Sequence, residues 1–169
     1  MSFLLLMTSV AALAWLLRAA FGAGKDLRTA MRLGAAAAFL FTGVDHFLST
    51  ETRYLPMMPG FFGDLRAPLI WLTGVAELAG AVGLLVPLGV YRRLKLPDLR
   101  YWAGIGLAVL LAFLVIANVH VAIQGGGVEG FAFGAWYFWL RPLFQPLIAL
   151  WVLYAAGVIR RDGRLRRGE

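Results

Sequence analysis

Residues 68–90 have the sequence PLIWLTGVAELAGAVGLLVPLGV, an apolar run in which Glu77 is the only charged residue. A helix needs about 20 such residues to cross the ~30 Å hydrocarbon core of a bilayer. Comparable runs occupy residues 30–49, 101–123 and 135–158, and a further run, which contains Arg18, occupies residues 2–21. Because backbone polar groups cannot be left unpaired in lipid, runs of this length predict helices rather than open strands.

The composition agrees with lipid as the surrounding solvent. The chain has 169 residues, of which 61% are hydrophobic and 15% are charged, whereas a soluble domain has about 45–50% apolar and about 25% charged residues. The sequence therefore predicts one all-α membrane domain over residues 1–169, a transmembrane bundle with a four-helix core and an extra N-terminal helix at 2–21. We expect that helix to be retained, because its positive charge follows the apolar run, whereas a signal peptide has the charge before it.

Basic residues are concentrated in alternate connectors. Segments 22–32, 91–100 and 159–169 hold twelve of the sixteen Lys and Arg residues, whereas connectors 49–67 and 124–134 hold only Arg53 and Arg66. Lys and Arg are enriched on the cytoplasmic side of membrane proteins. The pattern predicts a multi-pass protein of the cell (inner) membrane with a basic cytoplasmic tail at 159–169. It also explains the net charge of +7 through topology and anionic lipid, without a nucleic-acid partner.

Small residues mark the 68–90 run as a packing element. Ala76 and Gly80, like Ala79 and Gly83, are separated by three residues, a spacing that lets helices approach closely within lipid. We expect this helix to lie at the centre of the bundle.

Six of the polar side chains inside the predicted spans form a candidate cluster, in the half that the charge pattern assigns to the outer leaflet. They come from four runs: Asp45, His46, Glu77, Asn118, Arg141 and Gln145. Charged groups at the bilayer centre cost about 2.5–3.5 kcal/mol each on insertion scales, so each needs a partner or a use. We expect the six to converge on one binding site, with the Arg141 fork facing the carboxylate of Glu77 or Asp45. The alternative is that a Glu77–Arg141 ion pair only fixes the helix arrangement.

The sequence gives little support for a metal site or for a catalytic or nucleotide-binding motif. His120 lies two residues from Asn118, on a different helix face, and is expected at the membrane interface. No pair of the intramembrane histidines and carboxylates has the i, i+3 or i, i+4 spacing that places metal ligands on one helix face, so we predict no metal site. There is no cysteine, no phosphate-binding loop, no nucleophile elbow and no dinucleotide fingerprint. No catalytic residue can be assigned, and we expect no catalysis by the chain on its own.

Short motifs follow one another between residues 30 and 158. They are GVDHF at 43–47, Pro56 with Met58-Pro59, WLTGVAEL at 71–78 running on to GLLVP at 83–87, ANVH at 117–120 and LRPLFQ at 140–145. In this order they resemble the DoxX/DoxD-like family of small bacterial membrane proteins. The resemblance implies a four-helix membrane bundle, to which residues 2–21 are an addition. The family takes its name from a subunit associated with thiosulfate:quinone oxidoreductase, and some relatives are linked to membrane redox or oxidative-stress complexes.

The expected function follows from the polar cluster together with this resemblance. We expect an accessory subunit of a quinone-linked redox assembly, with quinone as the ligand and a membrane protein or a second copy of the chain as partner. One alternative is a non-enzymatic membrane module that binds a small solute or lipid, or helps to assemble another protein. Another is a purely structural protein.

Overall fold

The computed structural model describes residues 3–22, 24, 26–125 and 134–159. The elements of this part are all helical, which confirms the predicted all-α fold class. In chain order they are α1 (Phe3–Ala20), α2 (Leu27–Leu48), the π-helical turn η1 (Thr50–Tyr54), α3 (Leu55–Met57), the 3-10 turn η2 (Gly60–Leu65), α4 (Arg66–Leu85), α5 (Leu88–Arg93), α6 (Leu99–Ile123) and α7 (Gly134–Ala156).

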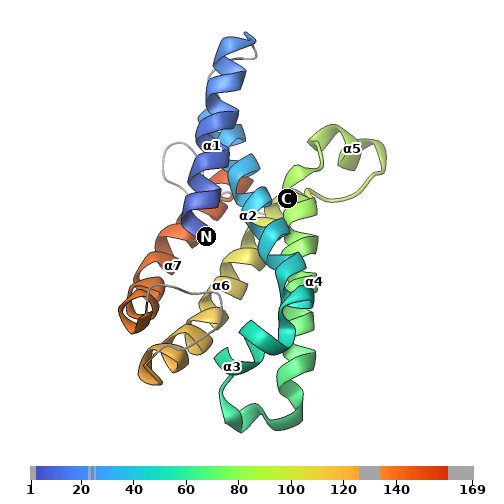
Figure 1. The fold of residues 1–169 in the computed structure, drawn as a ribbon. Coiled ribbons are helices and arrows are strands. Elements are labelled where there is room, and N and C mark those ends of the chain that lie inside the picture. The colour runs from blue at the N-terminus through green and yellow to red at the C-terminus, as the bar shows by residue number, and fades with distance from the viewer. Residues whose placement is uncertain (1–2, 23, 25, 126–133, 160–169) are drawn as a thin grey trace.

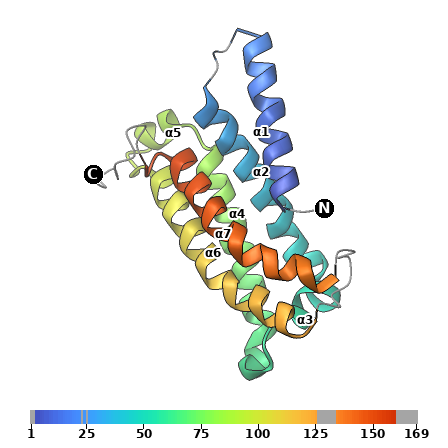
Figure 2. The same ribbon diagram turned by 90° about the vertical axis from the view of Figure 1, so that its left-hand side faces the viewer.

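Four long helices form a closed bundle. α2 packs on α4, α4 on α6, α6 on α7, and α7 packs back on α2, while α1 packs on α2 (Figure 1). Figure 2 shows α1 and α2 as an antiparallel pair that extends past α5 at one end of the molecule. We call this end, which carries Arg92, Arg93 and Lys95, the basic end, and the opposite end, which carries η1, α3 and η2, the connector end.

The composition of these helices makes the chain a multi-pass membrane protein. In the described part, four stretches are long and apolar enough to cross a bilayer, namely Phe3–Ala20, Gly60–Leu85, Leu99–Ile123 and Trp136–Ala156. Large apolar side chains on their surfaces, such as Leu72, Phe113 and Leu143, are exposed, which suits contact with lipid. The α2 helix has the length of a span but contains Arg28, Arg32 and Asp45. It packs on α1, α4 and α7.

The predicted helix at 68–90 ends early. α4 stops at Leu85, Val86 is extended (φ −60°, ψ 127°), and residues 88–93 form the separate helix α5. Pro87 explains the break, since proline lacks an N–H and disfavours helical backbone in the residue before it. Arg100 Nη2 donates a hydrogen bond of 2.9 Å to the Val86 carbonyl and so covers the end of α4.

Small residues provide the close helix contacts, as predicted for α4. Gly74 meets Gly43 of α2, Gly80 meets Leu107 of α6, and Gly83 faces Ala103 of α6. The central helix is nevertheless α2 rather than α4, because α2 packs closely on three long helices. Its alanines at positions 30, 35, 36 and 38 are fully buried and leave room for these neighbours.

Candidate functional site

A cavity of about 320 Å³ lies in the half of the bundle toward the connector end. Apolar and aromatic side chains supply most of its lining: Phe3, Leu4, Phe39, Tyr54, Met57, Met58, Ile70, Leu111, Leu114, Ala117, Trp136, Tyr137, Leu140, Phe144 and Ile148. Small-molecule sites are typically cavities of about 300–1,000 Å³ with such a lining and a few polar groups that fix orientation. The cavity therefore has the size and character of a binding site.

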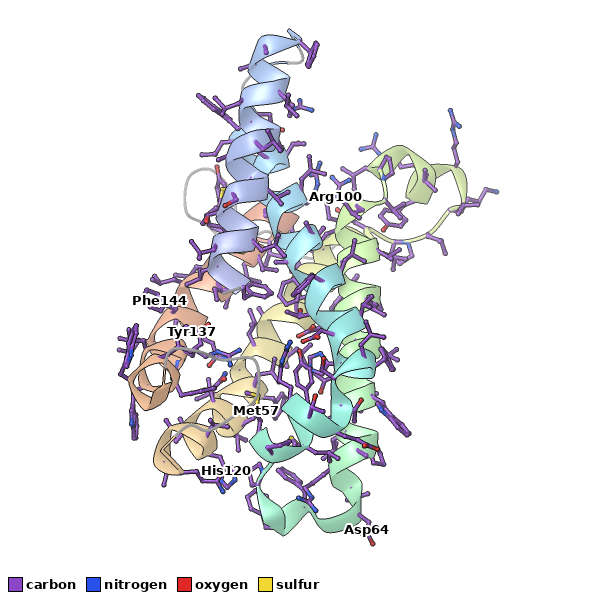
Figure 3. All side chains as sticks on the ribbon, in the orientation of Figure 1. Met57, Asp64, Arg100, His120, Tyr137 and Phe144 are labelled. Atoms are coloured by element: carbon purple, nitrogen blue, oxygen red, sulfur yellow. The ribbon has the colours of Figure 1, made fainter. Side chains whose placement is uncertain are left out.

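Polar side chains from all four core helices reach this cavity. Five of the six predicted residues line it, namely His46 from α2, Glu77 from α4, Asn118 from α6, and Arg141 and Gln145 from α7. The exposed fractions of His46, Glu77, Asn118 and Gln145 are 5%, 3%, 4% and 7%, so these groups are shielded from solvent and lipid alike. In Figure 3 the lining residues Met57 and Tyr137 lie toward the connector end, whereas Arg100 lies toward α5.

Glu77 lies beside two groups of α2. Its Oε2 lies 2.5 Å from Thr42 Oγ1 and 3.6 Å from His46 Nδ1. Thr42 Oγ1 also lies 3.1 Å from the Ala38 carbonyl oxygen, and its single proton can serve only one acceptor at a time. An ionised Glu77 accepts from Thr42, whereas a protonated Glu77 can donate to Thr42, which then donates to Ala38. The geometry thus accommodates both protonation states of the carboxyl group.

The orientation of the His46 ring is fixed on two sides. Nδ1 lies 2.7 Å from the Thr42 carbonyl oxygen, which can only accept, so Nδ1 carries a proton. In the neutral ring Nε2 is then the acceptor. The ring also stacks on Tyr54, with centroids 3.9 Å apart and planes inclined by 24°. His46 is therefore a rigid group whose second nitrogen can receive a hydrogen bond or a proton.

Asn118 and Gln145 have amide groups whose orientation follows from their partners. Asn118 Nδ2 donates to the Leu114 carbonyl at 3.0 Å, and Gln145 Nε2 donates to the Leu111 carbonyl at 3.2 Å. A carbonyl cannot donate, so the nitrogen of each amide must face it. Asn118 Oδ1 and Gln145 Oε1 are then left buried without a hydrogen-bond partner in the described part of the chain.

Arg141 supplies a cation at the same cavity. Its guanidinium carbon lies 5.7 Å from the ring centroids of both Tyr137 and Phe138, within the range of cation–π attraction. Arg141 and Glu77 both line the cavity, and the direct ion pair between them stays a prediction.

Asp45 does not belong to this site, which corrects the prediction for that residue. Its carboxylate accepts hydrogen bonds from Arg53, from Tyr54 Oη at 2.9 Å and from Ser49 Oγ at 2.8 Å. Adjacent residues of a helix point about 100° apart, so Asp45 faces the η1 turn while His46 faces the cavity. Burial and the Asp45 carboxylate raise the pKa of the Tyr54 hydroxyl, which keeps its proton and remains a donor.

The sequence prediction missed two threonines and two tyrosines of the lining. Thr42 lies four residues before His46, and Thr73 lies four residues before Glu77, so this spacing already placed each pair on one helix face. Tyr54 and Tyr137 carry no comparable signal, because their approach to the cavity depends on how the connector and α7 pack. His120 is half-buried and is not part of the lining.

Comparisons with known proteins give a family but no described activity. The chain matches a protein family described as Domain of unknown function (DUF8561) over residues 35–156. This range extends from α2 to the end of α7 and includes every polar residue of the cavity. No curated protein matches the chain, and no solved structure matches it either. On the extent of the family match, the chain belongs to the family described as Domain of unknown function (DUF8561).

Proposed function

We propose that the protein is an accessory subunit of a quinone-linked redox assembly of the cell membrane, and that its cavity holds the ring of a quinone-type molecule. The observation that carries this proposal is the cavity itself, which is largely apolar and aromatic but receives polar groups from four helices. A ring with oxygen substituents has the complementary chemistry. The ordered motifs that resemble the DoxX/DoxD-like family support the same assignment.

Access from the lipid phase also supports a membrane-soluble ligand. Trp136, Leu140 and Phe144 line the cavity, and their exposed fractions are 60%, 36% and 40%. The cavity therefore adjoins the outer surface of α7, where a lipid-dissolved molecule can approach without crossing water. The distribution of basic residues favours an orientation with the basic end in the cytoplasm, which would put the cavity in the outer half of the bilayer.

The test is to determine what the protein retains from native membrane. Wild-type protein should co-purify with quinone, measured by solvent extraction and mass spectrometry. Glu77→Gln and Arg141→Met should lower the retained amount, because each variant alters the polar side of the cavity. Arg92→Met is the matched control, since Arg92 is exposed at the basic end. If the protein neither retains nor binds quinone, and Glu77→Gln leaves quinone-linked activity in cells unchanged, the proposal is wrong.

Two further candidates are a module that binds a small solute or lipid and a protein with a purely structural role. The structural role is favoured by the hydrogen bond that Glu77 already makes with Thr42 of its own chain. If Glu77 and Arg141 form an ion pair whose role is only structural, combining Glu77→Gln with Arg141→Met should destabilise the protein less than either change alone. If a solute binds, it should raise the unfolding temperature, and Arg141→Ala should abolish that shift.

A further inference from the structure

Two buried amide oxygens at the cavity have no hydrogen-bond partner in the described part of the chain. They are Asn118 Oδ1 and Gln145 Oε1, and each amide nitrogen uses one of its two N–H groups to donate to a backbone carbonyl. A neutral His46, with its proton on Nδ1, adds Nε2 as a third acceptor. Buried polar atoms of this kind are almost always satisfied in folded proteins, so these acceptors call for a donor.

Three hydroxyl donors of the same lining are used within the chain. Thr73 Oγ1 donates to the Leu69 carbonyl at 2.8 Å, and Tyr54 Oη donates to Asp45 at 2.9 Å. The Thr42 hydroxyl serves Glu77 or the Ala38 carbonyl. Arg141 offers several N–H groups, but an oxygen of a carbonyl and an oxygen of a hydroxyl can both accept from it. Arg141 and the remaining N–H groups of Asn118 and Gln145 therefore do not discriminate between ligands of these two kinds.

The two redox forms of a quinone-type ring differ in whether they can donate hydrogen bonds. The oxidised form has carbonyl oxygens, which only accept, and it would leave the two amide oxygens unsatisfied. The reduced form has hydroxyl groups, each of which donates one hydrogen bond and can also accept one. The reduced form can thus satisfy Asn118 or Gln145 and still accept from Arg141. Sites whose buried polar groups need a partner discriminate strongly against a ligand that lacks it.

We infer that the cavity binds the hydroquinone form of its ligand in preference to the quinone form. The inference rests on the proposed function, since it specifies which form of the proposed ligand the site selects. A protein with this preference would hold the reduced form of the membrane pool beside a partner, and binding would raise the two-electron midpoint potential of the bound couple.

The test compares the two forms of one short-chain benzoquinone with the purified full-length protein in lipid nanodiscs. Binding is measured without oxygen by quenching of tryptophan fluorescence, since Trp136 lines the cavity. The hydroquinone should bind at least about tenfold more tightly than the quinone, which corresponds to a rise of about 30 mV in the two-electron midpoint potential. Asn118→Leu and Gln145→Met should each reduce the preference to less than about threefold, mainly by weakening hydroquinone binding.

Two further variants keep the result interpretable. In its protonated form, Gln145→Glu keeps a donor for the Leu111 carbonyl and an oxygen acceptor of the same reach, and it should retain most of the preference. Gln124→Met makes the same change as Gln145→Met at an exposed position after α6 and should leave binding of both forms unchanged. If both forms bind equally, or the quinone binds more tightly, the inference is overturned while the proposed function stands. If neither form binds, the proposed function fails as well.

Discussion

The contact between α2 and α4 beside the cavity can be tested with a single methyl group. A Cβ atom on Gly74 would lie 2.9 Å from His46 Cβ, 2.9 Å from Phe47 Cε2 and 3.0 Å from the Gly43 carbonyl oxygen. Two carbon atoms make their best contact at about 3.5–4.0 Å, so Gly74→Ala requires α2 and α4 to separate by roughly 0.6 Å. The backbone oxygen of Gly43 cannot move aside as a side chain can.

The expected cost of this change is a loss of about 1–3 kcal/mol in the free energy of unfolding, as for other overpacked interiors. The separation should also carry His46 away from Glu77, because Gly74 precedes Glu77 by one helical turn on the face that meets α2. Gly106 of α6 is the matched control, since a Cβ there meets nothing within 4 Å. Gly106→Ala should instead stabilise the helix by roughly 0.5–1 kcal/mol.

Both variants can be compared with the wild type by reversible unfolding in mixed detergent micelles, followed by tryptophan fluorescence and circular dichroism. We expect Gly74→Ala to unfold before the wild type and Gly106→Ala to unfold after it. If Gly74→Ala is as stable as Gly106→Ala, the two helices do not meet at Gly43 and Gly74, and the placement of His46 beside Glu77 is wrong.

Three further predictions follow from single contacts. Thr42→Val should lower the free energy of unfolding by about 1–3 kcal/mol, because it removes the hydroxyl partner of buried Glu77. Thr42→Ser keeps a hydroxyl group and should retain most of the wild-type stability. A Val variant of wild-type stability would show that this hydrogen bond is absent. Arg100→Met should destabilise the protein by about 1–2 kcal/mol through loss of the hydrogen bond to the Val86 carbonyl. The control Arg92→Met should change stability by less than about 0.5 kcal/mol. Equal effects of the two changes would argue against the hydrogen bond from Arg100 to the end of α4. A single cysteine replacing exposed Asp64 should react with an impermeant maleimide from outside the cell. A single cysteine replacing exposed Leu96 should react only after lysis. The reverse result would invert the proposed orientation.

Much of the bundle could be predicted from the chain because lipid imposes a simple rule on length and polarity. Apolar runs of the right length correspond to α1, α4, α6 and α7, with boundaries within a few residues except at residues 86–90, where the effect of Pro87 was not anticipated. The polar helix α2 was also found, although its central position depends on tertiary packing. Its charged residues alone give no indication that three helices pack on it.

The sequence predicts which residues form the candidate site better than it predicts the contacts between them. The depth of His46, Glu77, Asn118 and Gln145 in their runs was enough to group them, because groups at one depth on adjacent helices can meet. The prediction for Asp45 was wrong because this residue lies at the same depth as the site residues but points in a different direction around α2. The partners of Glu77 depend on which face of α2 meets α4, and that is decided by the Gly43 and Gly74 contact. A single sequence does not specify such a contact.

The central claim is that polar groups of four helices surround one ligand cavity, and an experimental density map of the protein in native lipid tests it most directly. At a resolution that shows side chains, we expect density for a ring-shaped, non-protein molecule between α2, α4, α6 and α7, in contact with Asn118, Gln145 and Arg141. The claim is contradicted if these side chains point to separate surfaces, or if the side chains of the protein fill the space between the four helices.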